Sequence, residues 1–397
     1  MRVHDAIYGQ FELPDFIERL VLSPEFRRLS EVRLININSA SLAALADVRR
    51  YSHTLGVLYL LLKNPLPSLG EDEYRALMAA LIVHDAGTPA FAHLFEYFLT
   101  DRYNWDHESV VPLLLRGEHH TDRNMHQIFS SHGPKFERLC RESKVDFEIV
   151  LSMIEGRHPA SKLIFGSLDF DNIDNVARMN WMLGHRFDVD SLVNLASSLD
   201  LGPGGQLCLP REQESNLQLW GELRRRAYEV LVYDGPTVAG QAVLSRAIAD
   251  ALEDGTLSDV DWHYNDMDLI RTVREHSHKG KLRLEQDFFG PPPATLLMLR
   301  LDDCSDLEGR SREALTEDIE EFLRVRFRVS RPYGYVFRDR GTFSKRVEIF
   351  DPGSRQSWAF GQRSSSLIIY GFGGRISAKD PAAVGREFTS WMGRNQR

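Results

Sequence analysis

The chain of 397 residues has little that would support a secreted, disulfide-bonded or membrane-embedded protein. Its three cysteines, Cys140, Cys208 and Cys304, are widely spaced, so the sequence predicts neither a disulfide framework nor a thiolate zinc site. No apolar run approaches the roughly 18 residues that a transmembrane helix needs. Residues 1–13 also lack the basic and then apolar pattern of a secretory signal. We therefore expect a cytoplasmic protein with no membrane partner.

An excess of positive charge is also absent. Lysine and arginine number 48 against 57 aspartate and glutamate residues, which gives a formal net charge of -9. This balance argues against a protein coated in nucleic acid, although a local basic groove remains compatible with it. The length is sufficient for one large core and a smaller second domain.

Helical patterning dominates the first 290 residues. Residues 1–13 alternate around Gly9 and predict a short β-hairpin, and a helical pattern follows to about residue 200. The Gly-Pro-Gly-Gly segment at 202–205 predicts a loop, after which helices are expected at 216–227 and 240–252. Prolines at 291–293 then form a stiff linker.

The C-terminal residues have a different pattern. Apolar residues between 323 and 329 alternate with Arg324, Arg326 and Arg328, which predicts a strand with one basic face. That face is either solvated or an anion site for a regulatory nucleotide, an oligomer contact or nucleic acid. Further elements are expected as strands at 347–350, 358–360 and 367–370 and a closing helix at 381–392.

These patterns predict a mainly α protein with a short N-terminal hairpin and a small α+β C-terminal domain. We divide it into a hairpin and helical core at 1–200, a helical extension at 201–290 and the C-terminal domain at 291–397.

Four residues have identities and surroundings suited to a divalent metal ion. The apolar run 76–83 ends in the pair His84-Asp85, and a carboxylate there must be paired or bound to a cation. His53 lies in an earlier apolar helix. Asp171 lies in the acidic opening of a later helix, where capping is the alternative role. Two imidazoles and two carboxylates from three helices can hold one divalent cation.

Four sequence blocks resemble a known family. They are His4–Gly9, Ser23–Leu29, Arg50–Val57 and His84–His93, within an aligned region of about 1–235. In this order they resemble the HD-domain phosphohydrolases, specifically the deoxynucleoside triphosphate triphosphohydrolase branch. The pair His4-Asp5 also spells His-Asp, but it lies in the hairpin and is not expected to bind metal.

The resemblance implies roles for individual residues. It makes His53, His84, Asp85 and Asp171 the ligands of one metal ion, which could be manganese, iron, magnesium or zinc. It places the further catalytic residues His93, His107 and Arg50 near the scissile phosphate. It also implies an HD-domain helical bundle, a homo-oligomer and a possible regulatory nucleotide.

Several positions depart from the family pattern on the substrate side. The family residues at these positions are a histidine, a lysine, a tyrosine, an aspartate and a triphosphate-binding arginine. The matching residues here are Thr88, Asn172, Asn175, Met179 and Trp220. Arg224 lies one turn beyond Trp220 and could replace the missing arginine.

The leading hypothesis is therefore a metal-dependent phosphohydrolase acting on nucleotides, similar to the triphosphohydrolases but with altered substrate specificity. The alternatives are a phosphodiesterase or nuclease acting on oligonucleotides or cyclic nucleotides, and a nucleotide-binding regulatory protein with weak catalysis.

Overall fold

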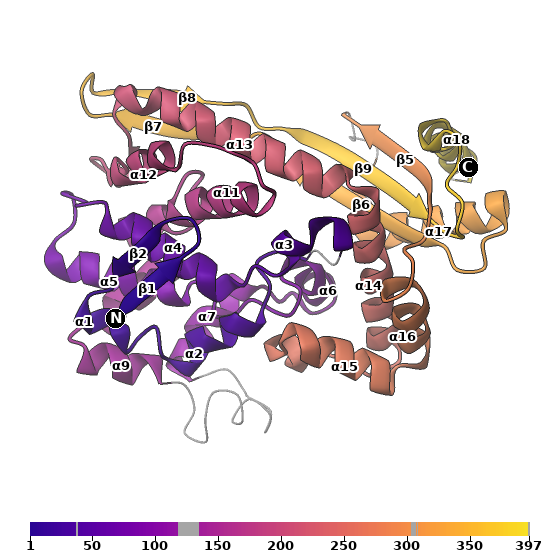
Figure 1. The fold of residues 1–397 in the computed structure, drawn as a ribbon, viewed down its shortest axis with the longest axis horizontal. Helices are drawn as coiled ribbons and strands as arrows, with labels where there is room; N and C mark the ends of the chain where they lie inside the picture. Colours follow the sequence, from indigo (N-terminus) through magenta and orange to yellow (C-terminus); the bar gives the residue numbers. More distant parts are fainter. Residues whose placement is uncertain (37–38, 118–134, 303–306, 308, 396–397) are drawn as a thin grey trace.

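The computed structural model describes residues 1–36, 39–117, 135–302, 307 and 309–395. In Figure 1 the N-terminal helices gather on one side, while strands from the C-terminal region run across the top of the molecule. The long helix α13 (Glu214–Tyr233) lies along these strands. This arrangement brings the C-terminal region over the helical body.

The N-terminal body begins with the predicted hairpin, formed by β1 (Arg2–Asp5) and β2 (Gly9–Glu12). Its helices are α1 (Asp15–Glu18), α2 (Pro24–Arg27), α3 (Ala43–Ala46), α4 (Arg50–Leu62), α5 (Glu71–Val83), α6 (His93–Tyr103), α7 (His107–Arg116), α9 (Phe136–Glu142), α10 (Phe147–Ile154), α11 (Phe170–Met182) and α12 (Val189–Ser197).

The helical extension and the C-terminal region complete the chain. After the short strands β3 (Asp200–Leu201) and β4 (Leu207–Cys208), the extension contains α13, α14 (Gly235–Glu253), α15 (Asp266–His276) and α16 (His278–Arg283). The C-terminal elements are β5 (Thr295–Leu301), α17 (Arg312–Phe327), β6 (Tyr333–Arg340), β7 (Val347–Asp351), β8 (Gln356–Phe360), β9 (Ser365–Phe372) and α18 (Pro381–Asn395).

The central helices α4 and α5 are apolar on most sides, and other helices pack around them. Helix α5 buries every residue from Ala76 to Val83, and α4 buries residues on several sides. Each large aliphatic side chain removed from water contributes roughly 1.5–3 kcal/mol. Packing of α4 against α5 and α11 therefore fixes the ends of these helices, where the polar residues predicted to form the site are located.

The C-terminal strands join the body. Strands β5, β9 and β6 form one antiparallel sheet. In the second sheet β4 pairs in parallel with β7, with Cys208 opposite Phe350. The segment that follows residue 200 is therefore joined to the C-terminal region by strand pairing. Val347 and Tyr370 belong to the same buried cluster as the helical core. The division into three domains stays a prediction.

The strand predicted from 323 to 329 is wrong. These residues end helix α17, and Arg328 follows it with a left-handed φ of 53°. The buried residues Leu315, Ile319, Phe322 and Leu323 recur every three or four positions, and this helical face packs into its own cluster. Arg324 and Arg326 stay exposed and pair with glutamates. Over a few residues, the alternation with arginine imitated the period of a strand.

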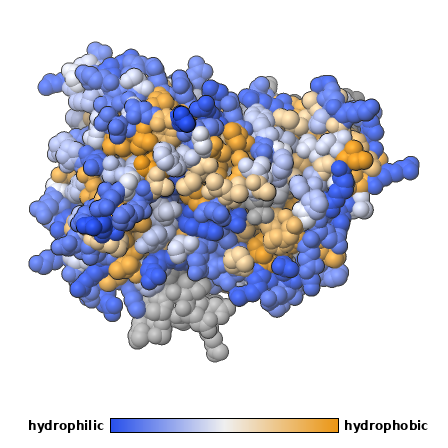
Figure 2. All heavy atoms as spheres, viewed as in Figure 1, coloured by the Kyte–Doolittle hydropathy of each residue, from blue (hydrophilic) through white to orange (hydrophobic). Residues whose placement is uncertain are grey.

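The other predicted elements are confirmed, and the fold is mainly α. The helices expected at 216–227, 240–252 and 381–392 and the strands expected at 347–350, 358–360 and 367–370 all form. Among the described residues, no helix has the length and apolar character needed to cross a membrane. Figure 2 shows hydrophilic residues over much of one face, with apolar patches between them. Cys140 and Cys208 are free thiols, and Cys304 lies outside the described residues.

Candidate metal centre and active site

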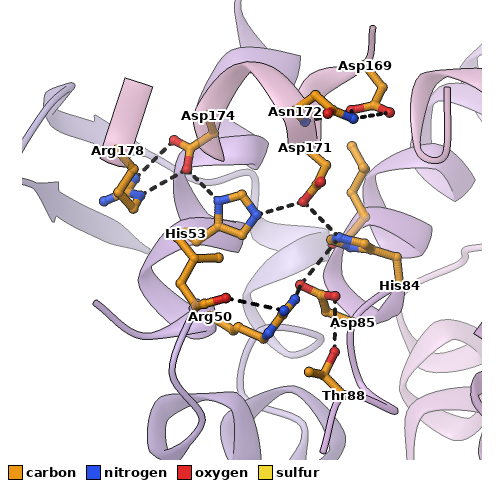
Figure 3. Close-up of polar contacts among 12 residues, drawn as sticks. Arg50, His53, His84, Asp85, Thr88, Asp169, Asp171, Asn172, Asp174 and Arg178 are labelled. Carbon is orange, nitrogen blue, oxygen red and sulfur yellow. Dashed lines mark hydrogen bonds and ion pairs between the residues drawn. The ribbon is translucent and has the colours of Figure 1, made fainter. Parts of the chain in front are cut away.

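Three helices bring the four predicted metal ligands together. Helix α4 carries His53, the end of α5 leads into His84 and Asp85, and the first turn of α11 carries Asp171. Oδ1 of Asp171 lies 2.7 Å from Nε2 of His53 and 3.3 Å from Nε2 of His84. Nε2 of His84 lies 3.6 Å from Oδ2 of Asp85. Figure 3 shows the two imidazoles turned toward Asp171.

This set of donor atoms has the size of a metal site. Ligand atoms of His53, Asp85 and Asp171 all lie within 4.8 Å of one another. Nitrogen and oxygen ligands placed about 2.1 Å from a cation, at near right angles, would be about 3 Å apart. The contacts of Asp171 with the two imidazoles are close to that value. The residues present therefore fit a divalent cation in both chemistry and spacing.

The orientation of each imidazole is set by its other nitrogen. Nδ1 of His53 lies 2.6 Å from Oδ2 of Asp174, and Nδ1 of His84 lies 2.8 Å from the Leu81 carbonyl oxygen. Since a carboxylate and a carbonyl only accept hydrogen bonds, Nδ1 donates in both cases. Both Nε2 atoms are left to face Asp171, which is the usual arrangement behind metal-binding histidines.

Arg178 holds the carboxylate of Asp174 and is itself held by Asp5. Arg178 donates to both carboxylate oxygens of Asp174, at 2.9 and 3.0 Å, and also to Asp5 of the N-terminal hairpin at 3.0 Å. The pair His4-Asp5 thus supplies no ligand, but Asp5 anchors the arginine behind His53. Gly56 makes room for this cluster, because a Cβ atom there would overlap Asp174 and Arg178.

Asp85 is held by a turn and by an arginine. His84 caps α5, and the backbone turns so that the Thr88 amide donates to the Asp85 carbonyl at 2.9 Å. The Thr88 hydroxyl donates to Oδ1 of Asp85 at 3.2 Å, and Nη1 of Arg50 lies 2.6 Å from Oδ2. Thr88, one of the departures from the family pattern, therefore orients a predicted ligand.

The buried carboxylates draw positive charge into the site. Burial alone would lower the pKa of His53, but Asp171 and Asp174 outweigh it and raise that pKa to about 9. His84 behaves alike: burial lowers its pKa, while Asp85 and Asp171 raise it to about 9. Burial would raise the pKa of Asp85, but Arg50 and His84 hold it below its usual range. The carboxylates therefore favour positive charge at this position.

His93 and His107 form a separate pair linked by Glu96. Nδ1 of His93 lies 2.6 Å from Oε2 of Glu96, while Nδ1 of His107 contacts Oε1. Burial would raise the pKa of Glu96, but the two histidines hold it well below its usual range. Burial alone would lower the pKa of His107, but Glu96 outweighs it, so the net shift is upward. These three residues also have ligand atoms within 4.8 Å of one another.

The four predicted metal ligands and the histidines His93 and His107 line one cavity of about 480 Å³. Its walls include Arg50, His53, His84, Asp85, His93, His107 and Asp171, so the structure brings all seven predicted site residues together. The C-terminal region contributes side chains that sequence reasoning did not assign to the site, namely Tyr335, Phe337, Thr342, Lys345 and Tyr370.

The positions that depart from the family pattern do not all reach the cavity. Asn172 and Asn175 line it. Met179 packs in a hydrophobic cluster with Leu34 and Leu45. Trp220 is buried, and its Nε1 lies 3.4 Å from the Asn172 carbonyl oxygen. At the positions that reach the cavity, the side chains are therefore uncharged amides.

The chain is similar in sequence to known triphosphohydrolases. The deoxynucleoside triphosphate triphosphohydrolase SAMHD1 homolog of Dictyostelium discoideum is 24% identical over 234 residues, covering 54% of this chain and 42% of that protein. The human deoxynucleoside triphosphate triphosphohydrolase SAMHD1 is 24% identical over 264 residues, covering 57% and 41%. The chain resembles the HD-domain triphosphohydrolases. This similarity confirms the family resemblance that we inferred from the four sequence blocks.

The relatives match only in part. The chain spans less than half the length of these triphosphohydrolases. A solved phosphohydrolase from Bacteroides thetaiotaomicron matches with a TM-score of 0.62 at 14% identity, covering 95% of this chain and 100% of that chain. This likeness shows a shared fold. No family model matches the chain.

Proposed function

We propose that this protein is a metal-dependent phosphohydrolase that acts on nucleotides, with His53, His84, Asp85 and Asp171 as ligands of one divalent cation. The convergence of both Nε2 atoms on Asp171, at 2.7 and 3.3 Å, carries this proposal. The similarity to triphosphohydrolases supports it.

A divalent cation bound there would supply Lewis-acid chemistry, lowering the pKa of a water molecule and polarising a phosphoryl group. Manganese, iron, magnesium and zinc all suit two nitrogen and two oxygen donors.

The chain's own residues would bind the phosphate and move a proton. Arg50 points from α4 into the same cavity and can donate to a phosphoryl oxygen. Nδ1 of His107 is occupied by Glu96, so Nε2 is the atom that can pass a proton to the leaving oxygen. His93, also bound to Glu96 but largely exposed, lies at the rim of the cavity, with its ring centroid 5.9 Å from that of His107. We propose His107 as the general acid.

The proposed substrate is a deoxynucleoside triphosphate or a closely related nucleotide. The names of the relatives support this class. Asn172, Asn175 and Met179 stand where the family has a lysine, a tyrosine and an aspartate that helps to read the sugar, and we therefore propose an altered specificity. By the same resemblance we propose a cytoplasmic homo-oligomer with a regulatory nucleotide, which light scattering with and without added nucleotides would test.

The nuclease alternative has lost its main support. It relied on a basic strand at 324–328. Residues 324–327 instead end helix α17, and Arg324 and Arg326 pair with glutamates. The regulatory alternative predicts binding without turnover.

A panel of nucleotides tests the proposal directly. Each nucleotide is incubated with manganese, magnesium, iron, cobalt or zinc, and the products are separated by chromatography. Release of tripolyphosphate identifies triphosphohydrolase chemistry, and Asp85→Ala is expected to abolish it. Asp190→Ala, an exposed aspartate on α12, serves as the control. Absence of turnover on every free nucleotide with every metal overturns the proposal.

A further inference from the structure

One buried carboxylate holds the starts of two helices that carry site residues. Asp266, the first residue of α15, is almost fully buried. Its Oδ1 accepts from the backbone amide of Phe91 at 2.8 Å, two residues before His93 begins α6. Its Oδ2 lies 3.2 Å from Nη1 of Arg49, the residue that caps α4. The two oxygens of a single side chain therefore reach the ends of two helices that line the cavity.

The backbone at Phe91 and Ala92 is strained. Phe91 has a φ of 53°, and Ala92 has a φ of 50° with a ψ of -130°. Residues with a Cβ atom rarely adopt such angles, which glycine adopts readily. Two such residues in succession persist only where the surrounding structure holds them. The bond from the Phe91 amide to Asp266 is one such hold, and the buried Phe91 ring, 5.2 Å from the Arg33 guanidinium, is another.

The strained turn determines where α6 begins. Ala92 is the N-cap of α6, and His93 and Glu96 lie in the first turn of this helix. Glu96 in turn accepts from the His107 amide at 3.1 Å and contacts Nδ1 of the same residue. The proposed general acid is thus oriented by a glutamate that directly follows the strained turn. A change in the backbone at residues 91 and 92 would move Glu96, and His107 with it, relative to the metal centre.

The second oxygen of Asp266 holds the segments that lead into α4. The backbone amide of Arg33 donates to Oδ2 at 3.1 Å, and Nε of Arg33 lies 3.3 Å from the same oxygen. Arg33 pairs with Arg49 through an isolated antiparallel bridge. Arg49 directly precedes Arg50, and its carbonyl accepts from the His53 amide at 3.2 Å. Oδ2 therefore fixes the helix start that carries a phosphate-binding candidate and a predicted metal ligand.

Arg28 joins the segment before α15 to a third helix end. This buried arginine donates to five carbonyl oxygens, three in the segment before α15 and two in the turn that follows Asp85, namely those of Trp262, His263, Tyr264, Ala86 and Thr88. The contacts of Arg28 go to the backbone at the end of α5, whereas Asp266 reaches the starts of α4 and α6. The segment at 262–266 therefore contacts all three helix ends that border the cavity on this side of the chain's contacts with α15.

We propose that Asp266 is a positioning residue for the hydrolytic reaction. Held at once to the starts of α4 and α6, it keeps the Glu96–His107 pair at a fixed distance from the metal centre. Asp266 is not one of the described residues that line the cavity, so it acts through the Phe91 amide and the two arginines rather than on the substrate. The assignment rests on the proposed function.

Kinetics of Asp266→Asn test this role in the full chain. The substitution keeps the size of the side chain but removes its charge and one acceptor oxygen. We expect kcat to fall by roughly 10–100-fold, because a small displacement of the general acid slows proton transfer. KM and the affinity for manganese, measured by calorimetry, should each change by less than about threefold, because substrate and metal bind to other residues. An unchanged kcat overturns the proposal.

Asp268→Asn is the matched control, because Asp268 lies in the same first turn of α15. Its carboxylate contacts only the neighbouring Asn265 amide and Arg271 among the hydrogen bonds of the described residues. The control weakens the start of α15 without touching α4 or α6, and its kcat should stay within about twofold of the unmodified protein. Both variants are assayed well below their melting temperatures. An equal fall of kcat in the two variants would contradict a specific role for Asp266.

Ala92→Gly separates positioning from general stabilisation. Glycine adopts the backbone angles of residue 92 without strain, so the turn then depends less on its bond to Asp266. The fall in kcat caused by Asp266→Asn should therefore be at least about threefold smaller in the Ala92→Gly background than in the unmodified background. A fall of the same size in both backgrounds would show that Asp266 only stabilises the fold, and it would overturn the proposal.

Histidine resonances give a readout that does not depend on turnover. The imidazole signals of His107 are recorded by NMR on protein with isotope-labelled histidine and are identified by their loss in His107→Gln. Asp266→Asn is expected to shift them and Asp268→Asn to leave them unchanged, because only the first variant moves Glu96. If the shift occurs but the unmodified protein hydrolyses no nucleotide, Asp266 still positions the pair and the proposed enzymatic function is rejected. Unchanged signals in Asp266→Asn overturn the positioning role.

Discussion

Oδ2 of Asp174 lies 2.6 Å from Nδ1 of His53, and this contact decides which nitrogen of His53 faces the metal centre. Asp174 is completely buried and is itself held by Arg178. The carboxylate thus fixes both the tautomer and the ring orientation of His53. Residues that bind no metal themselves therefore set the geometry of those that can.

We expect Asp174→Asn to weaken divalent metal binding by about 10–100-fold, because the amide cannot replace the carboxylate behind His53. Titration of manganese by calorimetry measures the change. Asp5→Asn is the matched comparison, since Asp5 contacts Arg178 but not His53. Equal losses of affinity in the two variants would contradict a specific role for Asp174.

Gly56→Ala should destabilise the protein, although alanine is the better helix former. An added Cβ atom would overlap the side chains of Asp174 and Arg178. Such overpacking costs typically 1–3 kcal/mol, against a gain in helix propensity of about 1 kcal/mol. Denaturant unfolding measures the difference.

The control for this change is Gly393→Ala in α18, where an added Cβ atom meets nothing within 4 Å. There the helix propensity acts alone, and a gain of up to about 1 kcal/mol is expected. Gly56→Ala should also weaken metal binding, since it displaces Asp174. Unchanged stability and metal affinity in Gly56→Ala would show that the cluster can move aside at no cost.

Manganese should stabilise the folded protein, and Asp171→Asn should remove this effect. A ligand present at about 100 times its dissociation constant adds about 2.7 kcal/mol to the free energy of unfolding. Asp171 contacts both imidazoles, so its loss affects the whole donor set. Unfolding curves with and without manganese test this, with the exposed Asp190→Asn as control. Stabilisation that persists in Asp171→Asn would locate metal binding elsewhere.

Glu96→Gln should move the alkaline limb of the pH–rate profile to lower pH. Burial lowers the pKa of His107, but Glu96 raises it above the ordinary 6.5. If His107 acts as a protonated acid, activity falls as the pH rises through this raised pKa. Removing the carboxylate lowers the pKa, so the fall begins earlier.

The contribution of the His107–Glu96 pair to folding stability also falls as the pH rises. Its contribution is complete below pH 6.5 and is lost as the pH rises through the raised pKa of His107. Glu96→Gln should therefore flatten the pH dependence of stability above pH 6.5. Profiles of kcat and of unfolding free energy measure both effects, and an alkaline limb that does not move would exclude His107 as the general acid.

Sequence reasoning located the predicted ligands but not their supports. His53, His84 and Asp85 stand out because they interrupt apolar runs, and the family resemblance adds Asp171, which lies in the acidic opening of a helix. Asp174 and Arg178 follow Asp171 at helical spacing and could have been found as its neighbours on α11. Glu96, three residues after His93, carries a similar signal.

Lys345 and Asp5 carry no such local signal. Lys345 lies 173 positions from Asn172, and Asp5 lies 173 positions from Arg178. Nothing near either residue in the sequence marks it as part of a site. The strand wrongly predicted at 323–329 has the opposite cause: a short local pattern was misleading because the buried face of α17 begins earlier, at Leu315.

The sequence by itself determined the helical core and the donor types that meet at its helix ends, because periodic burial and isolated polar residues are local properties of the chain. Only the tertiary structure decided that β7 pairs with β4 and that Lys345 joins Arg224 beside Asn172. These contacts arise when distant segments pack together, and their partners cannot be read from residue spacing.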